Sequence, residues 1–143
     1  MTADELARIH AAAMTEPPPW TAQTFEGFLS FPGAILASES RGFALGRVIA
    51  DEAELLTVAV HPEARRKGIA RRCLETFEAV AAQKGARRAF LEVAASNEAA
   101  RRLYVTTGYT AVGYRKGYYA RADGRHDDAI LMAKDLPGAH PDA

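Results

Sequence analysis

A short basic segment carries the clearest chemical signal in the sequence. Residues 65–71 read Arg-Arg-Lys-Gly-Ile-Ala-Arg and follow an apolar, β-prone run that ends before Pro62. A helical pattern begins at Ile69, so we expect free first-turn N–H groups and the positive end of a helix dipole there. Gly68 has no Cβ atom and lets the backbone come close to a ligand. With the cationic side chains around it, this arrangement predicts a site for a phosphate or pyrophosphate group.

The spacing within this segment argues against two common phosphate-binding motifs. It lacks the Gly-x-x-x-x-Gly-Lys-Ser/Thr pattern of nucleoside-triphosphate loops and the Gly-x-Gly-x-x-Gly pattern of dinucleotide-binding folds. An ordinary basic helix start after a strand is the alternative interpretation. The segment alone does not decide between that interpretation and an anion site.

Glu92 is the most informative single residue outside this segment. It lies in the apolar run Phe90-Leu-Glu-Val93, where alternation puts it on one face with Phe90 and Ala94. A carboxylate in such a strand loses hydration, which favours its protonated form unless a cation pairs with it. A carboxylate of this kind could act as a general base. A structural ion pair with one of the many arginines is the alternative, and the residues alone leave it open.

Two residues of the next predicted helix could take part in the same chemistry. Tyr104 lies on the inner face of that helix, where a tyrosine usually packs in the core. Its phenol also carries a proton that a leaving group could take. Asn97 stands at the start of the helix, where local capping and contact with a ligand are both open.

The histidines and the cysteine do not suggest a metal site or a nucleophile. His10 falls on a predicted helix and His61, His126 and His140 in predicted loops, and none has a partner at metal-ligand spacing. Cys73 is the single cysteine, so the chain has no internal disulfide. We expect Cys73 in a helix core, where a nucleophilic role is improbable.

Strands and helices that position these residues alternate along most of the chain. We expect helices over 4–14, just after Thr21, over 69–84 and over 97–107, and strands over 34–38, 43–50, 54–60, 89–93, 109–114 and 128–134. The first three strands predict an antiparallel meander, and the strand–helix–strand order after them predicts a βαβ unit with parallel strands. We expect turns at 40–42 and 51–53, a rigid connector at Pro17 to Pro19, and a loop at Tyr118 and Tyr119.

Composition indicates one globular domain. The chain has 143 residues, enough for a sizeable core, and we expect the domain over 1–136 with a frayed tail over 137–143. Lys plus Arg equals Asp plus Glu at 18 each, which argues against a general nucleic-acid binder. We see no signal peptide and no apolar run long enough to cross a bilayer. A cytoplasmic protein without a metal is therefore the expectation.

The basic segment resembles the (Gln/Arg)-x-x-Gly-x-(Gly/Ala) signature of the Gcn5-related N-acetyltransferase (GNAT) family, with Arg65, Gly68 and Ala70 on its fixed positions. The order of predicted elements is similar to that family along nearly the whole chain. Further motifs resemble one branch of it, the ribosomal-protein-alanine N-acetyltransferases. These motifs are Pro19-Trp20-Thr21, Leu91 to Asn97, Ala99-Ala100, Leu103-Tyr104, Gly108-Tyr109, Gly117-Tyr118-Tyr119, Asp123-Gly124-Arg125 and Asp127 to Met132.

The resemblance implies a mixed α/β GNAT fold, in which an antiparallel meander precedes a βαβ unit with splayed parallel strands and a closing hairpin. It implies an enzyme that moves acetyl from acetyl-CoA to the α-amine of a protein N-terminus by direct attack on the thioester. The implied acceptor is the N-terminal alanine of a small-subunit ribosomal protein. Under the resemblance, Glu92 is the general base and Tyr104 the general acid.

The resemblance also implies which residues touch the two substrates. Those implied to hold acetyl-CoA are Val58, Ala59, Val60, Arg66, Lys67, Gly68, Ile69, Ala70, Arg71 and Asn97. Backbone N–H groups near Val58 to Val60 would stabilise the developing oxyanion. Trp20, Tyr118 and Tyr119 are the residues implied to contact the acceptor.

One departure from the family and two rival functions stay open. The family usually begins with a strand ahead of the first helix, whereas only three residues precede it here. We therefore expect that strand to be missing or vestigial, which leaves the strand from Ala34 as an edge, unless the start codon is misplaced. The acceptor could instead be a polyamine or an aminoglycoside. The chain could also be a non-catalytic acyl-CoA sensor, which the presence of both Glu92 and Tyr104 disfavours.

Overall fold

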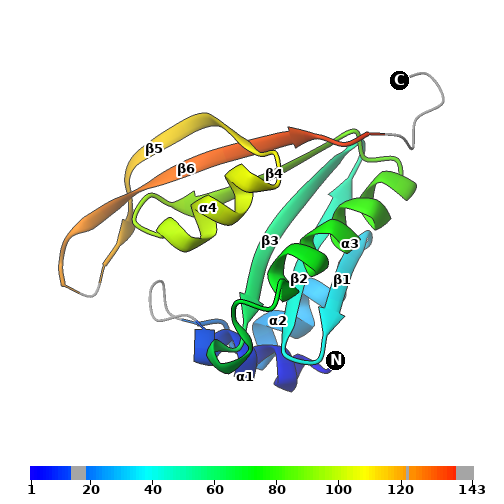
Figure 1. The fold of residues 1–143 in the computed structure, drawn as a ribbon, viewed down its shortest axis with the longest axis horizontal. Coiled ribbons are helices and arrows are strands. Elements are labelled where there is room, and N and C mark those ends of the chain that lie inside the picture. Colours follow the sequence, from blue (N-terminus) through cyan, green and yellow to red (C-terminus); the bar gives the residue numbers. More distant parts are fainter. Residues whose placement is uncertain (14–18, 122, 138–143) are drawn as a thin grey trace.

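One mixed sheet forms the frame of the molecule in its computed structural model, which describes residues 1–13, 19–121 and 123–137. Across these residues the strand order is β1-β2-β3-β4-β6-β5 (Figure 1). The elements are α1 (Ala3–Ala13), α2 (Ala22–Leu29), β1 (Ala34–Glu39), β2 (Gly42–Ile49), β3 (Glu52–Val60), the 3₁₀ turn η1 (Pro62–Ala64), α3 (Ile69–Gln83), β4 (Arg88–Ala94), α4 (Glu98–Thr106), β5 (Thr110–Ala120) and β6 (His126–Asp135). The predicted α/β class is confirmed.

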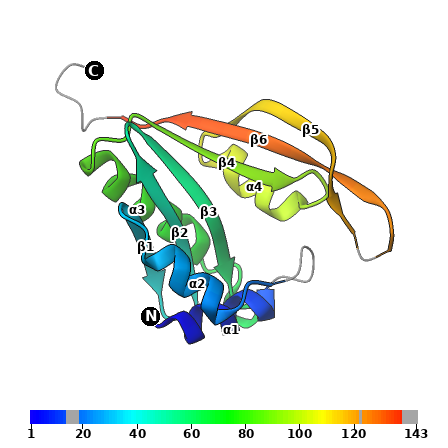
Figure 2. The same cartoon turned by 180° about the vertical axis from the view of Figure 1, so that it is seen from behind.

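Strands β1, β2 and β3 form the predicted antiparallel meander, and helices cover both of its faces. The core under α3 contains Leu55, Leu74 and Phe77. A second core lies on the opposite face, where Phe25 of α2 packs with Phe43 and other residues of α1, β2 and β3. Figures 1 and 2 show α3 on one side of these strands and α1 with α2 on the other. The meander is thereby the half of the sheet that is covered by helices on both faces.

Strands β3 and β4 are parallel neighbours, as the βαβ pattern predicted, but their pairing is short. Only residues 52–54 pair with 88–90 among the described residues. Further along β3, Leu45 of β2 pairs with Thr57 and Gly46 with Leu55, so Leu56 has no partner on β2. Such a bulge bends the strand and increases its twist. Beyond Glu54 the two parallel strands diverge (Figure 1).

The second half of the sheet contains β4 and the antiparallel pair of β6 and β5, the predicted closing hairpin. Helix α4 lies beside β4 on the same face of the sheet as α3 (Figure 1). The loop predicted at Tyr118 and Tyr119 is wrong, because β5 continues to Ala120. Gly117 has φ 62° and its N–H donates to Asp128 Oδ1 at 2.8 Å. The pairing register shifts at this point instead of ending, so the glycine marks an irregularity within the strand.

The first helix begins at a side-chain cap. Thr2 Oγ1 accepts the Glu5 N–H at 3.2 Å and Glu5 Oε1 accepts the Thr2 N–H at 3.1 Å, a reciprocal capping box. No strand precedes α1 in the described part of the chain, and β1 is an edge of the sheet. The turn predicted at 51–53 is too long, because Ala50 takes φ 56° and β3 already begins at Glu52. Most of the proline connector and of the predicted tail lies outside the described residues.

Candidate active site

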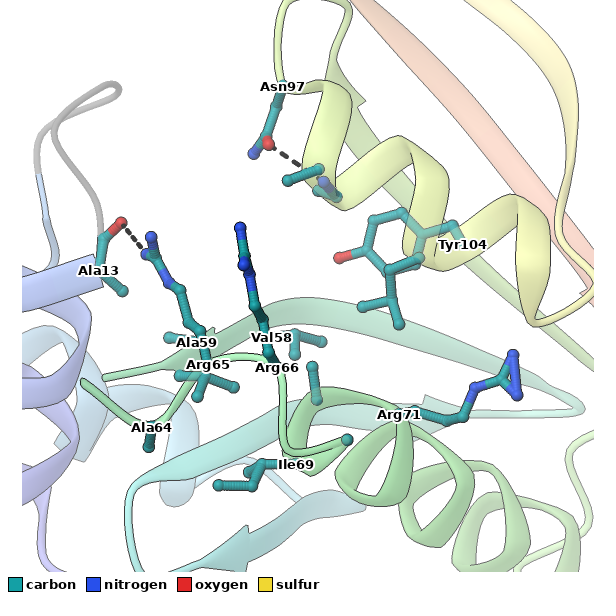
Figure 3. Close-up of a pocket in the computed structure, with 16 residues that line it drawn as sticks. Ala13, Val58, Ala59, Ala64, Arg65, Arg66, Ile69, Arg71, Asn97 and Tyr104 are labelled. Atoms are coloured by element: carbon teal, nitrogen blue, oxygen red, sulfur yellow. Dashed lines mark hydrogen bonds between the residues drawn. The ribbon is translucent and has the colours of Figure 1, made fainter. Parts of the chain in front are cut away.

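A cavity of about 490 Å³ opens where β3 and β4 diverge (Figure 3). One wall comes from β3 and from the loop and first turn that lead into α3, and the other wall comes from α4. The lining residues are Ala13, Val58, Ala59, Val60, Ala64, Arg65, Arg66, Gly68, Ile69, Ala70, Arg71, Asn97, Ala99, Ala100, Leu103 and Tyr104. The cavity thus brings together Tyr104 and every predicted cofactor-binding residue except Lys67.

The loop before α3 has the backbone geometry of an anion site. Gly68 takes φ 75° and Arg66 takes φ 67°, so two residues of this short loop are left-handed. No side chain caps the N-terminus of α3. The first-turn N–H groups of Ile69, Ala70 and Arg71 therefore remain available for a ligand, beside the positive end of the helix dipole. This is the arrangement that the basic segment predicted.

An ion pair at the end of β1 holds this loop in shape. Arg72 donates from Nε and Nη2 to the two carboxylate oxygens of Glu39, each at 2.8 Å. Its remaining Nη1 donates to the carbonyl oxygen of Lys67 at 2.8 Å. The hydrogen bonds from Arg72 hold the pKa of Glu39 below its ordinary value. The loop backbone is thereby tied to the meander, while the Lys67 side chain does not line the cavity.

The β3 wall offers a strand edge to an extended ligand. Beyond Glu54, the edge of β3 that faces β4 has no strand partner among the described residues. Val58, Ala59 and Val60 lie on this segment and line the cavity. A strand edge with free N–H and C=O groups can pair with amide groups of a ligand. The N–H groups at the start of α3 and the strand edge of β3 together fit an elongated molecule with phosphate groups at one end and amide groups along its length.

The α4 wall contributes Asn97 and Tyr104. Asn97 caps the helix, because its Oδ1 accepts the Ala100 N–H at 3.2 Å, and its side chain also borders the cavity (Figure 3). Tyr104 is 7% exposed, and its hydroxyl oxygen points into the cavity (Figure 3). Burial raises the pKa of Tyr104 well above its ordinary value. The phenol therefore holds its proton at neutral pH, as a proton donor must.

Glu92 lies on β4 outside the cavity lining. Its position in the strand is half-buried like those of Phe90 and Ala94, as alternation predicted. The Oε1 atom is buried and has no hydrogen-bond partner within the described ranges. The described residues also form no ion pair with Glu92, so nothing there supports the alternative that Glu92 belongs to a structural ion pair with an arginine. Burial, and after it the negative charge of Glu92, raises the pKa of Tyr119 to about 12.

The predicted acceptor contacts do not line the cavity. Trp20 stacks on His10 with ring centroids 5.1 Å apart and on Phe28 at 5.0 Å, so it packs between α1 and α2. Tyr118 is 53% exposed and meets Tyr119 edge-on with centroids 5.2 Å apart. The two tyrosines belong to the hairpin rather than to the cavity between β3 and α4.

Small and apolar residues of α4 were missed by the sequence reasoning. Ala99, Ala100 and Leu103 line the cavity beside Tyr104. Ala100 and Leu103 stand four and one positions before Tyr104, so helical periodicity puts them on the same inner face, and this was the available signal. Arg65 also lines the cavity, and its Nη2 donates to the Ala13 carbonyl oxygen at 3.3 Å.

The described residues contain no group of three His, Cys, Asp or Glu side chains that could hold a metal ion. His61 Nδ1 accepts the Glu63 N–H and starts η1, whereas His126 begins β6 rather than lying in a loop as predicted. Cys73 is buried in α3, and burial raises the pKa of its thiol. Within the same residues, no helix has both the length and the apolar character needed to span a membrane.

Comparisons with known proteins point to one family. The model of the acetyltransferase (GNAT) family matches residues 5–109. Ribosomal protein bS18-alanine N-acetyltransferase of Escherichia coli (strain K12) is 36% identical over 137 residues, which span 92% of this chain and 91% of that protein. Putative ribosomal protein bS18-alanine N-acetyltransferase of Bacillus subtilis (strain 168) is 31% identical over 90% of this chain and 86% of its own length.

A solved structure agrees with the sequence relatives. The crystal structure of the ribosomal-protein-S18-alanine N-acetyltransferase from Escherichia coli matches with a TM-score of 0.84 and 31% identity. The match covers 99% of this chain and 92% of that one. Since the family model also spans well over half of the sequence, the chain belongs to the acetyltransferase (GNAT) family.

Proposed function

We propose that the protein transfers the acetyl group of acetyl-CoA to the α-amine of a protein N-terminus, and that its acceptor is the N-terminal alanine of a small-subunit ribosomal protein. The observation that carries the proposal is the cavity itself. It joins an uncapped helix N-terminus, a free strand edge and a buried tyrosine hydroxyl in one space. The relatives that match this chain over most of their length act, by their names, on the alanine of ribosomal protein S18. Such an acceptor puts the protein in the cytoplasm, where ribosomal proteins are made.

The chain's own groups divide the binding of acetyl-CoA between them. The first-turn N–H groups of α3 and the amides around Gly68 take the pyrophosphate, with Arg66 and Arg71 adding charge nearby. Val58 to Val60 take the amide-bearing arm along their strand edge. When bound, acetyl-CoA supplies an activated acetyl thioester. Backbone N–H groups near Val58 to Val60 stabilise the negative charge that develops on the carbonyl oxygen under attack.

Glu92 and Tyr104 handle the two protons of the reaction. An acceptor amine is protonated at neutral pH and must lose a proton before it can attack. Glu92 accepts that proton through water, since its carboxylate lies outside the cavity while its Oε1 has no protein partner among the described residues. Tyr104 is buried, protonated and directed into the cavity, and gives its proton to the departing sulfur. Glu92 lies on β4 and Tyr104 on α4, and these two elements border the same side of the space where β3 and β4 diverge.

An assay of acceptors tests the proposal. We compare kcat/KM for a peptide that starts with alanine, the same peptide starting with leucine, its N-terminally blocked form, spermidine and an aminoglycoside. The alanine peptide should be the best acceptor, because a small first residue lets the amine reach the thioester. Faster turnover of spermidine or the aminoglycoside than of every peptide would favour a small-molecule acetyltransferase. Binding of acetyl-CoA with no turnover of any amine would favour the sensor.

A further inference from the structure

A partly buried charged network lies at the end of α4, outside the cavity lining. Glu78 of α3 is 9% exposed, and its Oε1 is 2.7 Å from Lys134 Nζ of β6. The hydroxyl of Tyr109, a residue that is 1% exposed, donates to the other oxygen of Glu78 at 2.9 Å. We call Glu78, Lys134 and Tyr109 the anchor network. It joins α3, β6 and the turn that follows α4.

The anchor network contacts the end of α4 at three points, two of which involve Tyr104 itself. Lys134 Nζ donates to the carbonyl oxygen of Thr107, just past the end of α4, at 2.7 Å. The Tyr109 N–H donates to the Tyr104 carbonyl oxygen at 2.9 Å. The Tyr109 ring meets the Tyr104 ring edge-on, with centroids 5.8 Å apart at 65°. The network therefore fixes both the backbone after Tyr104 and the surface against which its ring rests.

Stability alone does not account for charges at this place. Glu78 interrupts the apolar face of α3, where Leu74, Phe77 and Ala81 are fully buried. Taking a carboxylate and an ammonium out of water costs about as much as their attraction returns, and an apolar replacement of such a pair is often neutral or stabilising. The network instead fixes the orientation of the groups that it joins, because each of its hydrogen bonds has a preferred donor and acceptor geometry.

We propose that Glu78, Lys134 and Tyr109 are positioning residues that hold the Tyr104 hydroxyl at the point from which it serves the leaving sulfur. The inference rests on the proposed function, in which Tyr104 is the proton donor. Arg71 adds a restraint from the cavity side, where its Nη2 donates to the Thr106 carbonyl oxygen at 3.1 Å. The end of α4 is thus held from α3 and from β6 while its tyrosine faces the ligand.

An apolar replacement of the whole network separates positioning from stability. In the triple variant Glu78→Met, Lys134→Met and Tyr109→Phe, no side chain of the network is left unpaired. The half-buried Thr107 carbonyl oxygen loses its Lys134 donor, so Tm should stay near the wild-type value rather than rise. The KM for acetyl-CoA should be unchanged. The kcat should fall by about tenfold, because a misplacement of 1 Å can cost about 10²-fold and a loosened Tyr104 is displaced by less than that. An unchanged kcat in a folded triple variant would overturn the inference.

The matched control removes another partly buried ion pair. Arg47 Nε and Glu54 Oε1 are 3.0 Å apart and join β2 to β3, away from α4. Arg47→Met with Glu54→Met should leave kcat unchanged. A loss of kcat in this control as large as in the triple variant would also count against positioning. If the triple variant fails to fold, Tyr109→Phe alone removes one hydroxyl and should lower kcat by about threefold.

A double-mutant cycle with Tyr104→Phe decides whether the network acts through that tyrosine. Residues that work as a unit give non-additive effects. The triple variant and Tyr109→Phe should therefore lower kcat in the wild-type background. Each of them should have little further effect on kcat in the Tyr104→Phe background. Equal losses in both backgrounds would overturn the inference while leaving the role of Tyr104 intact. A Tyr104→Phe variant with full kcat would instead remove the proposed role of Tyr104, and the inference with it.

Discussion

The two halves of the sheet differ in how deeply their strands are buried. Strand β2 has five consecutive buried residues, because α3 covers one face of the meander and α1 with α2 cover the other. Strand β5 has no fully buried residue along its length. The first half thus presents a fixed backbone, suited to a ligand held by N–H groups and a strand edge. Within the second half, β4 and β6 still contribute buried residues to the core, so only the outer strand β5 has few packing constraints.

The largest expected effect concerns Glu92, at the border of the two halves. Glu92→Gln removes the proposed base, so kcat should fall by about 10²–10⁴-fold while affinity for acetyl-CoA stays nearly unchanged. The wild-type kcat/KM should rise with pH through an acidic limb, and the variant should alter that limb. Steady-state kinetics across pH measures both. Glu98→Gln, an exposed glutamate in the first turn of α4, is the matched control and should keep full activity. Full kcat in Glu92→Gln would remove the proposed role.

A second, smaller effect tests the fixed backbone of the first half. Acetyl-CoA at 100 times its Kd should stabilise the wild type by about 2.7 kcal/mol. Gly68→Asp should abolish the rise in Tm, because Gly68 has φ 75° and a Cβ there would meet Arg72 Nη1 at 3.2 Å. The added negative charge would also face the pyrophosphate. Gly27→Asp is the control, since a Cβ at Gly27 has nothing within 4 Å. An equal thermal shift in wild type and Gly68→Asp would exclude this loop from the site.

The smallest effect concerns stability rather than activity. His10 is buried between α1 and α2, and its Nδ1 accepts the backbone N–H of Trp20 at 3.0 Å. Burial lowers the pKa of His10 from 6.5 to about 4. The unfolded chain therefore takes up a proton below pH 6.5, whereas the folded chain does so only near pH 4. The contribution of His10 to the free energy of unfolding is full above pH 6.5 and is lost as the pH falls towards 4. It should decrease by roughly 1–2 kcal/mol between pH 7 and pH 5.

Thermal unfolding at several pH values measures this loss. His10→Gln keeps an acceptor for the Trp20 N–H but does not titrate, so its Tm should fall less on acidification. Both proteins should have the same kcat at pH 7, because His10 belongs to the packing of the first half. An identical pH dependence of Tm in both proteins would contradict the assignment of a buried, neutral His10.

The same contrast between halves explains what could be predicted from the sequence. The start of α3 at Ile69 was predicted to the residue because an apolar stripe, a glycine and a basic turn coincide there. The GNAT fold was likewise recognised, and the solved relative confirms it. The strand predicted over 109–114 corresponds to the first part of β5, but its continuation to Ala120 was not predicted, because a strand exposed on both faces shows no alternation and a glycine such as Gly117 is typical of a strand end.

Contacts between residues far apart in the chain could not be predicted from local sequence patterns. Glu78 looks like an interruption of the apolar stripe of α3, and its partners Tyr109 and Lys134 stand 31 and 56 positions away. No local spacing indicates such a network. The role of Glu92 was left open for the same reason, because only the folded chain reveals whether an arginine reaches it. In the described residues no arginine does.

The site of acetylation on a single peptide distinguishes N-terminal acetyl transfer from acetylation of a side chain or of a small amine. The peptide begins with alanine and carries one internal lysine, and tandem mass spectrometry locates the acetyl group after incubation with the protein and acetyl-CoA. We expect acetyl on the α-amine of the alanine, and Glu92→Gln should form far less of the same product in the same time. Acetyl on the lysine side chain, or none on the peptide while spermidine is acetylated, would contradict the proposed N-terminal acetyl transfer.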